Sequence, residues 1–88
     1  MAWFLYVVEC ADGTLYAGIT TEIERRLQEH NTSAKGARYT RARRPVRLLQ
    51  EAEFESRSQA SKAEYYFKRL TRTRKKEWVI EPFDLIES

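Results

Sequence analysis

Three apolar runs along the chain predict three β-strands. The first, Trp3–Cys10, is rich in aromatic and β-branched residues, and a turn sequence at residues 11–13 separates it from the second, Thr14–Ile19. The third run, Val46–Phe54, begins directly after Pro45. The short turn predicts that the first two strands pair as an antiparallel hairpin.

Helical periodicity predicts helices at residues 22–31, from residue 56 or 58 to about residue 70, and in a final short segment through residue 79. A cationic stretch at residues 35–44 predicts a short helix and a loop before the third strand. The whole pattern predicts an α+β domain with a small antiparallel sheet. Side chains that could cap the three main helices are, in order, Thr20 or Thr21, Ser56 or Ser58, and Thr71 or Thr73.

The length of the hairpin loop decides which side chains share a face of the sheet. A two-residue loop would place Tyr6 and Tyr16 on opposite faces, because side chains alternate along a strand. A three-residue loop, closed by a left-handed Gly13, pairs Val8 with Tyr16 and Tyr6 with Gly18. We predict the three-residue loop, which puts both tyrosines on one face beside a gap that could admit backbone or a ligand. Alternatively, both rings are packing aromatics of a half-buried sheet.

The first helix carries two polar side chains on its inner face. At 100° per residue, Ile23 and Leu27 lie about 40° apart and define the apolar stripe, and Arg26 and His30 fall on the same side. Arg25 falls on the opposite face and should be solvated. An inward cation and imidazole need a partner or a functional site. The alternatives are a structural ion pair for Arg26 and a hydrogen-bonded core histidine for His30.

The long helix places a carboxylate, Glu64, at the edge of its apolar stripe. One interpretation is a salt bridge from Glu64 to Arg26 or to a neighbouring lysine. The other is a ligand for Mg²⁺, which typically takes one or two protein carboxylates and keeps water and phosphate oxygens at its other positions. The stripe itself consists of Ala60, Ala63, Phe67 and Leu70.

Length and composition limit the class of protein. The 88 residues predict one domain at residues 1–80, followed by an acidic C-terminal tail at residues 81–88. No apolar run approaches the ~20 residues of a membrane span, and we expect no signal peptide. The single cysteine, Cys10, excludes an internal disulfide and a cysteine-based zinc site. We therefore expect a cytoplasmic protein, associated with the nucleoid or, in a eukaryote, nuclear.

The formal net charge of +3 hides a strong asymmetry along the chain. Residues 35–76 carry fourteen Lys and Arg against four acidic residues, whereas the last twelve residues carry four acidic residues and no cation. A separated basic block favours a polyanionic partner, of which nucleic acid is the commonest. An ordinary solvated face is the alternative.

Taken together, two phenols, an arginine, a histidine and one carboxylate beside a basic stretch favour phosphodiester chemistry. An arginine can stabilise charge on a phosphoryl oxygen, and a hard divalent ion can act as a Lewis acid. A tyrosine has an unperturbed pKa of ~10, so a tyrosine general base needs a neighbouring cation. The chain contains no Gly-rich phosphate loop and no zinc-ligand spacing. These residues predict a metal-dependent nuclease.

At these positions the sequence resembles the GIY-YIG nuclease superfamily. The strand signature appears as Phe4-Leu5-Tyr6 and Tyr16-Ala17-Gly18, followed by Arg26 and His30 in the first helix and Glu64 in the long helix. The segments WFLY, LYAGITTEIERRLQEHN, KGARYT and AEYYFKRLTR are similar to the small stand-alone YhbQ-like branch, over roughly residues 3–80.

The resemblance implies a three-stranded antiparallel sheet flanked by helices, and metal-dependent cleavage of DNA in a setting of repair or recombination. Tyr6 and Tyr16 would line the site, and one of them, expected to be Tyr16, would orient or deprotonate the attacking water. Arg26 would bind the scissile phosphate, and His30 would assist proton transfer or phosphate binding. Glu64 would be the only protein ligand of a single Mg²⁺ or Mn²⁺ ion.

The resemblance also implies a nucleic-acid-binding surface in and after the KGARYT segment. DNA is the expected partner and RNA the alternative, with contacts to the backbone and a tyrosine on which a base could stack. The residues expected to bind are Lys35, Arg38, Tyr39, Arg41 and Arg43.

The chain departs from the family pattern in three places. Phe4 occupies the position of the first motif glycine, Ile19 stands where some members carry a lysine, and no asparagine follows Asn31. Two alternatives to an independent nuclease therefore stay open. The chain could be a non-catalytic nucleic-acid-binding module, or a nuclease subunit whose protein partner supplies specificity.

Overall fold

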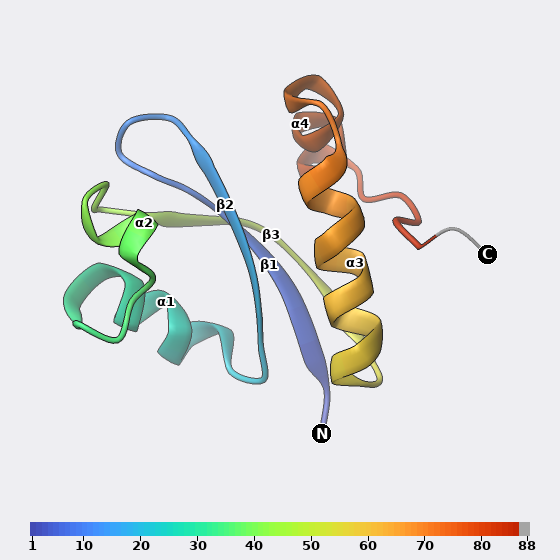
Figure 1. Ribbon diagram of the computed structural model, residues 1–88, viewed down its shortest axis with the longest axis horizontal. Coiled ribbons are helices and arrows are strands. Elements are labelled where there is room, and N and C mark those ends of the chain that lie inside the picture. The colour runs from blue at the N-terminus through green and yellow to red at the C-terminus, as the bar shows by residue number, and fades with distance from the viewer. Residues whose placement is uncertain (87–88) are drawn as a thin grey trace.

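The computed structural model describes residues 1–86 and contains a three-stranded antiparallel sheet with helices on both sides (Figure 1). The strand order is β2-β1-β3, so β1 is central and β2 is an edge strand. This architecture confirms the predicted α+β fold with a small antiparallel sheet. The elements are β1 (Trp3–Glu9), β2 (Leu15–Thr20), α1 (Ile23–Thr32), α2 (Arg38–Arg41), β3 (Arg47–Phe54), α3 (Arg57–Arg69) and α4 (Arg72–Ile80).

The β1–β2 hairpin has the three-residue loop that the sequence predicts. Val8 lies opposite Tyr16, and Tyr6 lies opposite Gly18. Gly13 closes the loop with a φ of 83°, a conformation that glycine adopts without a steric penalty. The space beside Gly18 is filled, however, because a β-carbon there would overlap the Tyr6 hydroxyl. The Tyr6 phenol itself therefore occupies the gap in which we expected backbone or a ligand.

The main core lies between one face of the sheet and the helices α3 and α4, which stand together on that side (Figure 1). The apolar stripe of α3 packs into this core as predicted, and the rings of Phe67 and Trp78 meet edge to face with centroids 5.4 Å apart. Each of these fully buried rings contributes about 2–3 kcal/mol through the area it removes from water. The buried members of the core are Leu5, Val7, Ala17, Ala63, Phe67, Trp78 and Leu85.

The opposite face of the sheet carries a smaller apolar cluster, against which α1 packs. Its buried members include Tyr6 and Val8 of β1, and Ile23 and Leu27 of α1 pack against them. This packing is the physical reason that the inner face of α1, with its polar members, points at the tyrosines of the hairpin.

Two of the three main helices begin as predicted. Ser56 and Thr71 cap α3 and α4, each accepting a hydrogen bond at 3.2 Å from the amide three residues further on. The prediction that Thr20 or Thr21 caps α1 is wrong, because the N-cap residue is Glu22 and no side chain caps it. Thr20 is the last residue of β2, and its hydroxyl instead accepts a hydrogen bond from the Glu22 amide at 3.1 Å. No helix within residues 1–86 is long and apolar enough to cross a membrane.

The residues that we expected to form an acidic C-terminal tail contribute to the core. Leu85 is 7% exposed and belongs to the main core cluster. The indole nitrogen of Trp78 donates a hydrogen bond to the carbonyl oxygen of Phe83 at 3.0 Å. The packed domain therefore extends to Ile86, which also packs against this cluster, whereas residues 87–88 of the expected tail lie outside the described residues.

Candidate active site

The centre of the candidate site is a buried hydrogen bond between Tyr6 of β1 and His30 of α1. The Tyr6 phenol lies over Gly18, and its oxygen is 2.7 Å from His30 Nε2. Tyr6 is 3% exposed, and His30 is completely buried. The Tyr16 ring meets the same imidazole edge to face, with centroids 5.3 Å apart. The structure therefore brings both predicted tyrosines and the predicted histidine together on the α1 side of the sheet.

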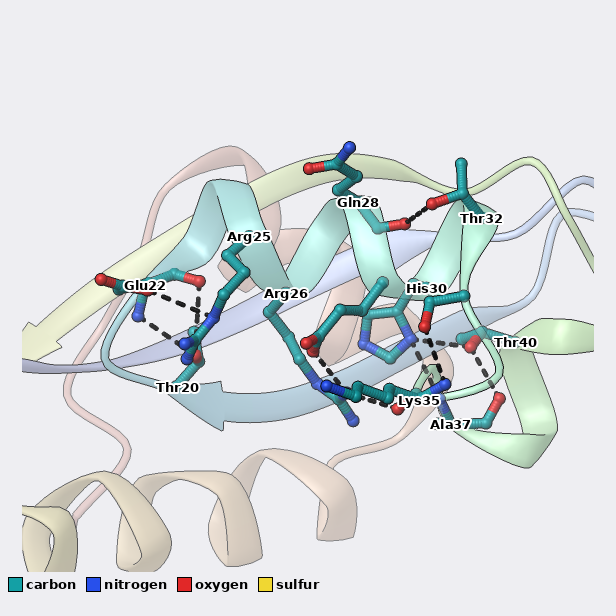
Figure 2. Close-up of polar contacts among 12 residues, drawn as sticks. Thr20, Glu22, Arg25, Arg26, Gln28, His30, Thr32, Lys35, Ala37 and Thr40 are labelled. Carbon is teal, nitrogen blue, oxygen red and sulfur yellow. Dashed lines mark hydrogen bonds and ion pairs between the residues drawn. The ribbon is translucent and has the colours of Figure 1, made fainter.

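Arg26 lies at the open side of this group, one helical turn before the histidine. Its guanidinium donates a hydrogen bond to the Glu29 carboxylate at 3.1 Å. It donates another to the Lys35 carbonyl oxygen at 2.8 Å (Figure 2). Its side chain is 27% exposed, whereas that of Arg25 is 62% exposed and pairs with Glu22. The two adjacent arginines therefore differ as the helix-face argument predicts, and Arg26 has the ion pair that was the structural alternative.

The tyrosine and the histidine are both neutral at neutral pH. Burial raises the pKa of Tyr6 to about 12, with the nearby Arg26 guanidinium lowering it and the Glu64 carboxylate raising it. Burial lowers the pKa of His30 from 6.5 to about 4, and the positive charge of Arg26 lowers it further. The phenol therefore keeps its proton, and the imidazole presents a free lone pair.

Glu64 approaches from the other side of the sheet, on α3, which packs against β2 and β1. Its side chain is 25% exposed and pairs with Lys68 at 3.5 Å, so the neighbouring lysine rather than Arg26 is its partner. Its charge is one of the smaller influences that raise the pKa of Tyr6, and no hydrogen bond or ion pair joins Glu64 to Tyr6, Arg26 or His30 among the described residues.

The single carboxylate of Glu64 suits a hard divalent ion whose other ligands are water and substrate oxygens. Among residues 1–86, no group of three or more His, Cys, Asp and Glu side chains could hold a metal. A single carboxylate fits Mg²⁺ or Mn²⁺, because such ions complete their shell with water and substrate oxygens. The present partner of Glu64 is an exposed lysine, and exposed ion pairs contribute only about 0–1 kcal/mol, so a divalent ion could displace it.

Two of the residues predicted to bind nucleic acid are already engaged with the domain. The Tyr39 ring stacks on that of Tyr16, with centroids 5.9 Å apart and an interplanar angle of 22°. The Arg43 guanidinium lies 3.9 Å from the centre of the Tyr39 ring and pairs with Asp12 at 3.0 Å. In this arrangement Tyr39 forms a wall of the site, and Arg43 ties that wall to the hairpin loop.

The other three predicted contacts are available to a partner. Lys35, Arg38 and Arg41 are exposed, and none of them forms an ion pair with an acidic side chain in the part of the chain that the structure describes. They flank the site in the loop after α1 and in α2, next to the Arg26 guanidinium that bonds the Lys35 carbonyl. These cations are therefore positioned to contact a polyanion at the site.

Sequence reasoning missed three residues that hold α2 and the following loop against α1. Thr40 is completely buried, and its hydroxyl lies 2.7 Å from His30 Nδ1. Arg44 bonds the carbonyl oxygens at the end of α1, and the Asn31 amide exchanges two hydrogen bonds with the backbone of Val46. Thr40 stands inside the KGARYT segment, but a four-residue helix gives no periodicity that would mark it as buried.

Comparison with known proteins agrees with this geometry. The family model of the GIY-YIG catalytic domain matches residues 2–77. The chain is 64% identical over 75 residues to the UPF0213 protein DP2720 of Desulfotalea psychrophila, which covers 85% of this chain and 68% of that protein. It is 56% identical over 72 residues to the UPF0213 protein SAG0778 of Streptococcus agalactiae, covering 82% and 81%.

Two solved structures are also similar to this chain. The solution NMR structure of the UPF0213 protein BH0048 from Bacillus halodurans is 42% identical with a TM-score of 0.59. That of the protein EF2693 from E. faecalis is 46% identical with a TM-score of 0.63. Each match covers 91% of this chain and 84% of the other.

Proposed function

The chain belongs to the family of GIY-YIG catalytic domains, a nuclease superfamily, and from this premise we propose that it is a divalent-metal-dependent endonuclease that hydrolyses phosphodiester bonds of DNA. The observation that carries the proposal is the buried Tyr6–His30 hydrogen bond beside the Arg26 guanidinium. The Arg26 side chain is 27% exposed beside this pair, so a phosphate could reach the guanidinium next to two groups that can exchange a proton.

The proposed base is the Tyr6–His30 pair rather than Tyr16. With a pKa of about 12, Tyr6 is not a preformed phenolate at neutral pH. It can still take a proton from water if its own proton moves to His30 Nε2, which lies 2.7 Å away. The hydroxide so formed attacks phosphorus, and the bond from phosphorus to the leaving oxygen breaks.

Arg26 has two roles in this proposal. Its guanidinium neutralises charge on a phosphoryl oxygen, for which a planar, permanently charged group is well suited. A phosphate bound there would also compensate the charge that lowers the pKa of His30, so the imidazole becomes a better proton acceptor once substrate is bound.

Glu64 is the residue that would hold a Mg²⁺ or Mn²⁺ ion. When bound, such an ion would supply Lewis-acid stabilisation of the phosphate and the leaving oxygen. The Glu64 side chain is 25% exposed and has only the exposed Lys68 as an ion-pair partner among the described residues, so the carboxylate is accessible to an ion.

The proposed DNA-binding surface consists of the exposed cations Lys35, Arg38 and Arg41. These residues lie in the loop before α2 and in α2 itself, beside Arg26. Contacts from lysine and arginine to phosphates carry no sequence information, so we propose that target choice comes from DNA structure or from a partner protein.

Cleavage of an end-labelled panel tests this function. The panel contains single-stranded, duplex, flap, nicked and branched DNA, together with RNA, and each is incubated with Mg²⁺, Mn²⁺ or EDTA. We expect at least one DNA member to be cut in the presence of a divalent ion and none in EDTA. Cleavage that persists in EDTA would contradict metal dependence. Salt-sensitive binding without any cleavage would favour the binding-module alternative.

A further inference from the structure

Thr40 contacts the ring nitrogen of His30 that Tyr6 does not contact. Its hydroxyl oxygen is 2.7 Å from His30 Nδ1, whereas Tyr6 bonds Nε2 on the other side of the ring. The same hydroxyl donates a hydrogen bond to the carbonyl oxygen of Ala37 at 2.9 Å (Figure 2). Thr40 and His30 are both completely buried, so neither can exchange these partners for water.

The loop before α2 is held tightly enough to fix this contact. A β-carbon on Gly36 would lie 2.6 Å from the Glu29 carbonyl oxygen and 2.9 Å from His30 Cα, so only glycine allows the loop to pass this close to α1. The Arg44 guanidinium bonds the carbonyl oxygens of Glu29, His30 and Ser33, which anchors the far end of the α2 segment to α1. The position of Thr40 relative to the imidazole is therefore set by the backbone on both sides.

The partners of these groups determine which ring nitrogen carries the proton. A carbonyl oxygen only accepts, so the hydroxyl proton of Thr40 is used on Ala37 and its lone pair faces Nδ1. The Ala37 amide also points at Nδ1, but at 3.4 Å its contact is much weaker than that of Thr40 at 2.7 Å, so Nδ1 carries the imidazole proton and donates it to Thr40. Nε2 is left with a lone pair, which accepts the proton of the Tyr6 hydroxyl.

The opposite tautomer would leave a buried donor without an acceptor. If Nε2 carried the proton, the Tyr6 hydroxyl would face a donor at His30, and its other close polar neighbour, the Arg26 guanidinium, also only donates. The first arrangement gives up the long contact of the Ala37 amide at 3.4 Å, whereas the second gives up the 2.7 Å bond of a buried phenol, which is the larger loss, so the hydrogen-bond network favours the first.

We propose that Thr40 is a positioning residue that holds the neutral imidazole of His30 in the Nδ1–H tautomer, so that Nε2 can receive the proton of Tyr6. The mechanistic part of this proposal rests on the proposed nuclease function. The tautomer itself does not, and it can be measured without any substrate. Thr40 touches no substrate in this scheme and acts only through the histidine.

The first measurement is the ¹⁵N spectrum of the imidazole in wild-type protein without a histidine tag. His30 is the only histidine, so its two ring nitrogens need no further assignment. We expect the protonated nitrogen to be Nδ1 and the unprotonated one to be Nε2. A wild-type spectrum with the proton on Nε2 would overturn the proposal, whatever the variants do.

Two variants of Thr40 then separate positioning from packing. Thr40→Val keeps the shape but removes the acceptor. The Ala37 amide, 3.4 Å from Nδ1, then remains as a donor to that nitrogen and favours protonation of Nε2 instead. We expect this variant to change tautomer and to lower kcat about 10–100-fold with little change in KM. Thr40→Ser restores the hydroxyl and should restore both the tautomer and kcat.

The matched control is Thr32→Val, because Thr32 is exposed and makes the same kind of bond, to the Gln28 carbonyl oxygen at 2.8 Å. It should leave the imidazole spectrum and kcat unchanged. If Thr40→Val folds and keeps the Nδ1–H tautomer, the proposal is overturned. If Thr40→Val does not fold, loss of this tautomer in Thr40→Ser would overturn the proposal instead. A wild-type protein with the expected tautomer but no cleavage on any substrate would leave Thr40 as the determinant of the tautomer and contradict the nuclease function alone.

Discussion

His30 should make the stability of this protein depend strongly on mildly acidic pH. The imidazole is completely buried, and burial together with the positive charges of Arg26 and Arg44 lowers its pKa to about 4, against an opposing effect of Glu29. In the unfolded chain the pKa returns to its ordinary value of about 6.5. Between these two values the unfolded state binds the proton and the folded state does not, so the free energy of unfolding falls as pH falls.

The size of this effect follows from the two pKa values. Each tenfold difference in proton affinity corresponds to about 1.4 kcal/mol, so the difference between 6.5 and 4 costs about 3 kcal/mol of stability by pH 4. That is a large part of the total for a small domain, whose free energy of unfolding is typically about 5–15 kcal/mol. The loss is absent above about pH 6.5 and grows steadily down to about pH 4.

Urea unfolding followed by tryptophan fluorescence at pH 7, 5.5 and 4 measures this effect, with His30→Gln as the comparison. The variant retains an amide that can bond both neighbours of the imidazole but does not titrate. Carboxylates titrate in both proteins, so their contribution cancels in the difference. We expect wild type to lose about 3 kcal/mol more than the variant between pH 7 and pH 4. Equal losses in the two proteins would refute the argument that the buried imidazole resists protonation.

Three further predictions concern the arginines of α1, the arginines of the α2 segment and the glycine opposite Tyr6. Arg26→Ala should lower the cleavage rate about 100-fold or more. Arg25→Ala loses only an exposed ion pair and should change the rate less than twofold. Equal effects of the two variants would contradict the assignment of the inner face of α1. Arg41→Glu should weaken DNA binding and reduce its salt dependence without changing the melting temperature. Arg43→Glu should lower the melting temperature, because it breaks an ion pair with Asp12 and a contact with the Tyr39 ring. Binding that the Arg41 change does not affect would show that α2 is not part of the interface. Gly18→Ala should lower the free energy of unfolding by about 1–3 kcal/mol, measured in urea, and should also lower the cleavage rate, because the added β-carbon displaces the buried Tyr6 phenol. A variant with full stability and full activity would contradict this packing.

The hairpin shows how far local rules lead from the sequence. A glycine at the third loop position fixes a three-residue loop, and the loop length alone determines that Tyr6 faces Gly18 and Val8 faces Tyr16. The 100° step of a helix likewise separates Arg25 from its neighbour in burial. These features depend on residues close together in the chain, so periodicity and turn chemistry are sufficient to predict them.

Contacts between distant segments could not be obtained in this way. The Thr40–His30 bond and the anchoring of α1 by Arg44 depend on how a loop folds back over a helix, and neither segment has a pattern that specifies the other. Glu64 is different, because its ion pair with Lys68 joins residues four apart on one helix and was one of the two partners that the sequence offered. The limit of local rules also explains Leu85, which lies in a short segment that contains three acidic residues and no helical or strand periodicity, and which nevertheless packs into the core.

The most direct test of the proposed active site is cleavage and DNA binding by Glu64→Ala, measured in parallel with wild type in Mg²⁺ or Mn²⁺. The matched control is Glu77→Ala, which removes a half-exposed carboxylate that also pairs with a neighbouring cation on its own helix, α4. We predict that Glu64→Ala binds DNA as tightly as wild type but does not cut it, while Glu77→Ala does both. Cleavage by Glu64→Ala at the rate of wild type would contradict the assignment of this carboxylate and of the site built around Tyr6, His30 and Arg26.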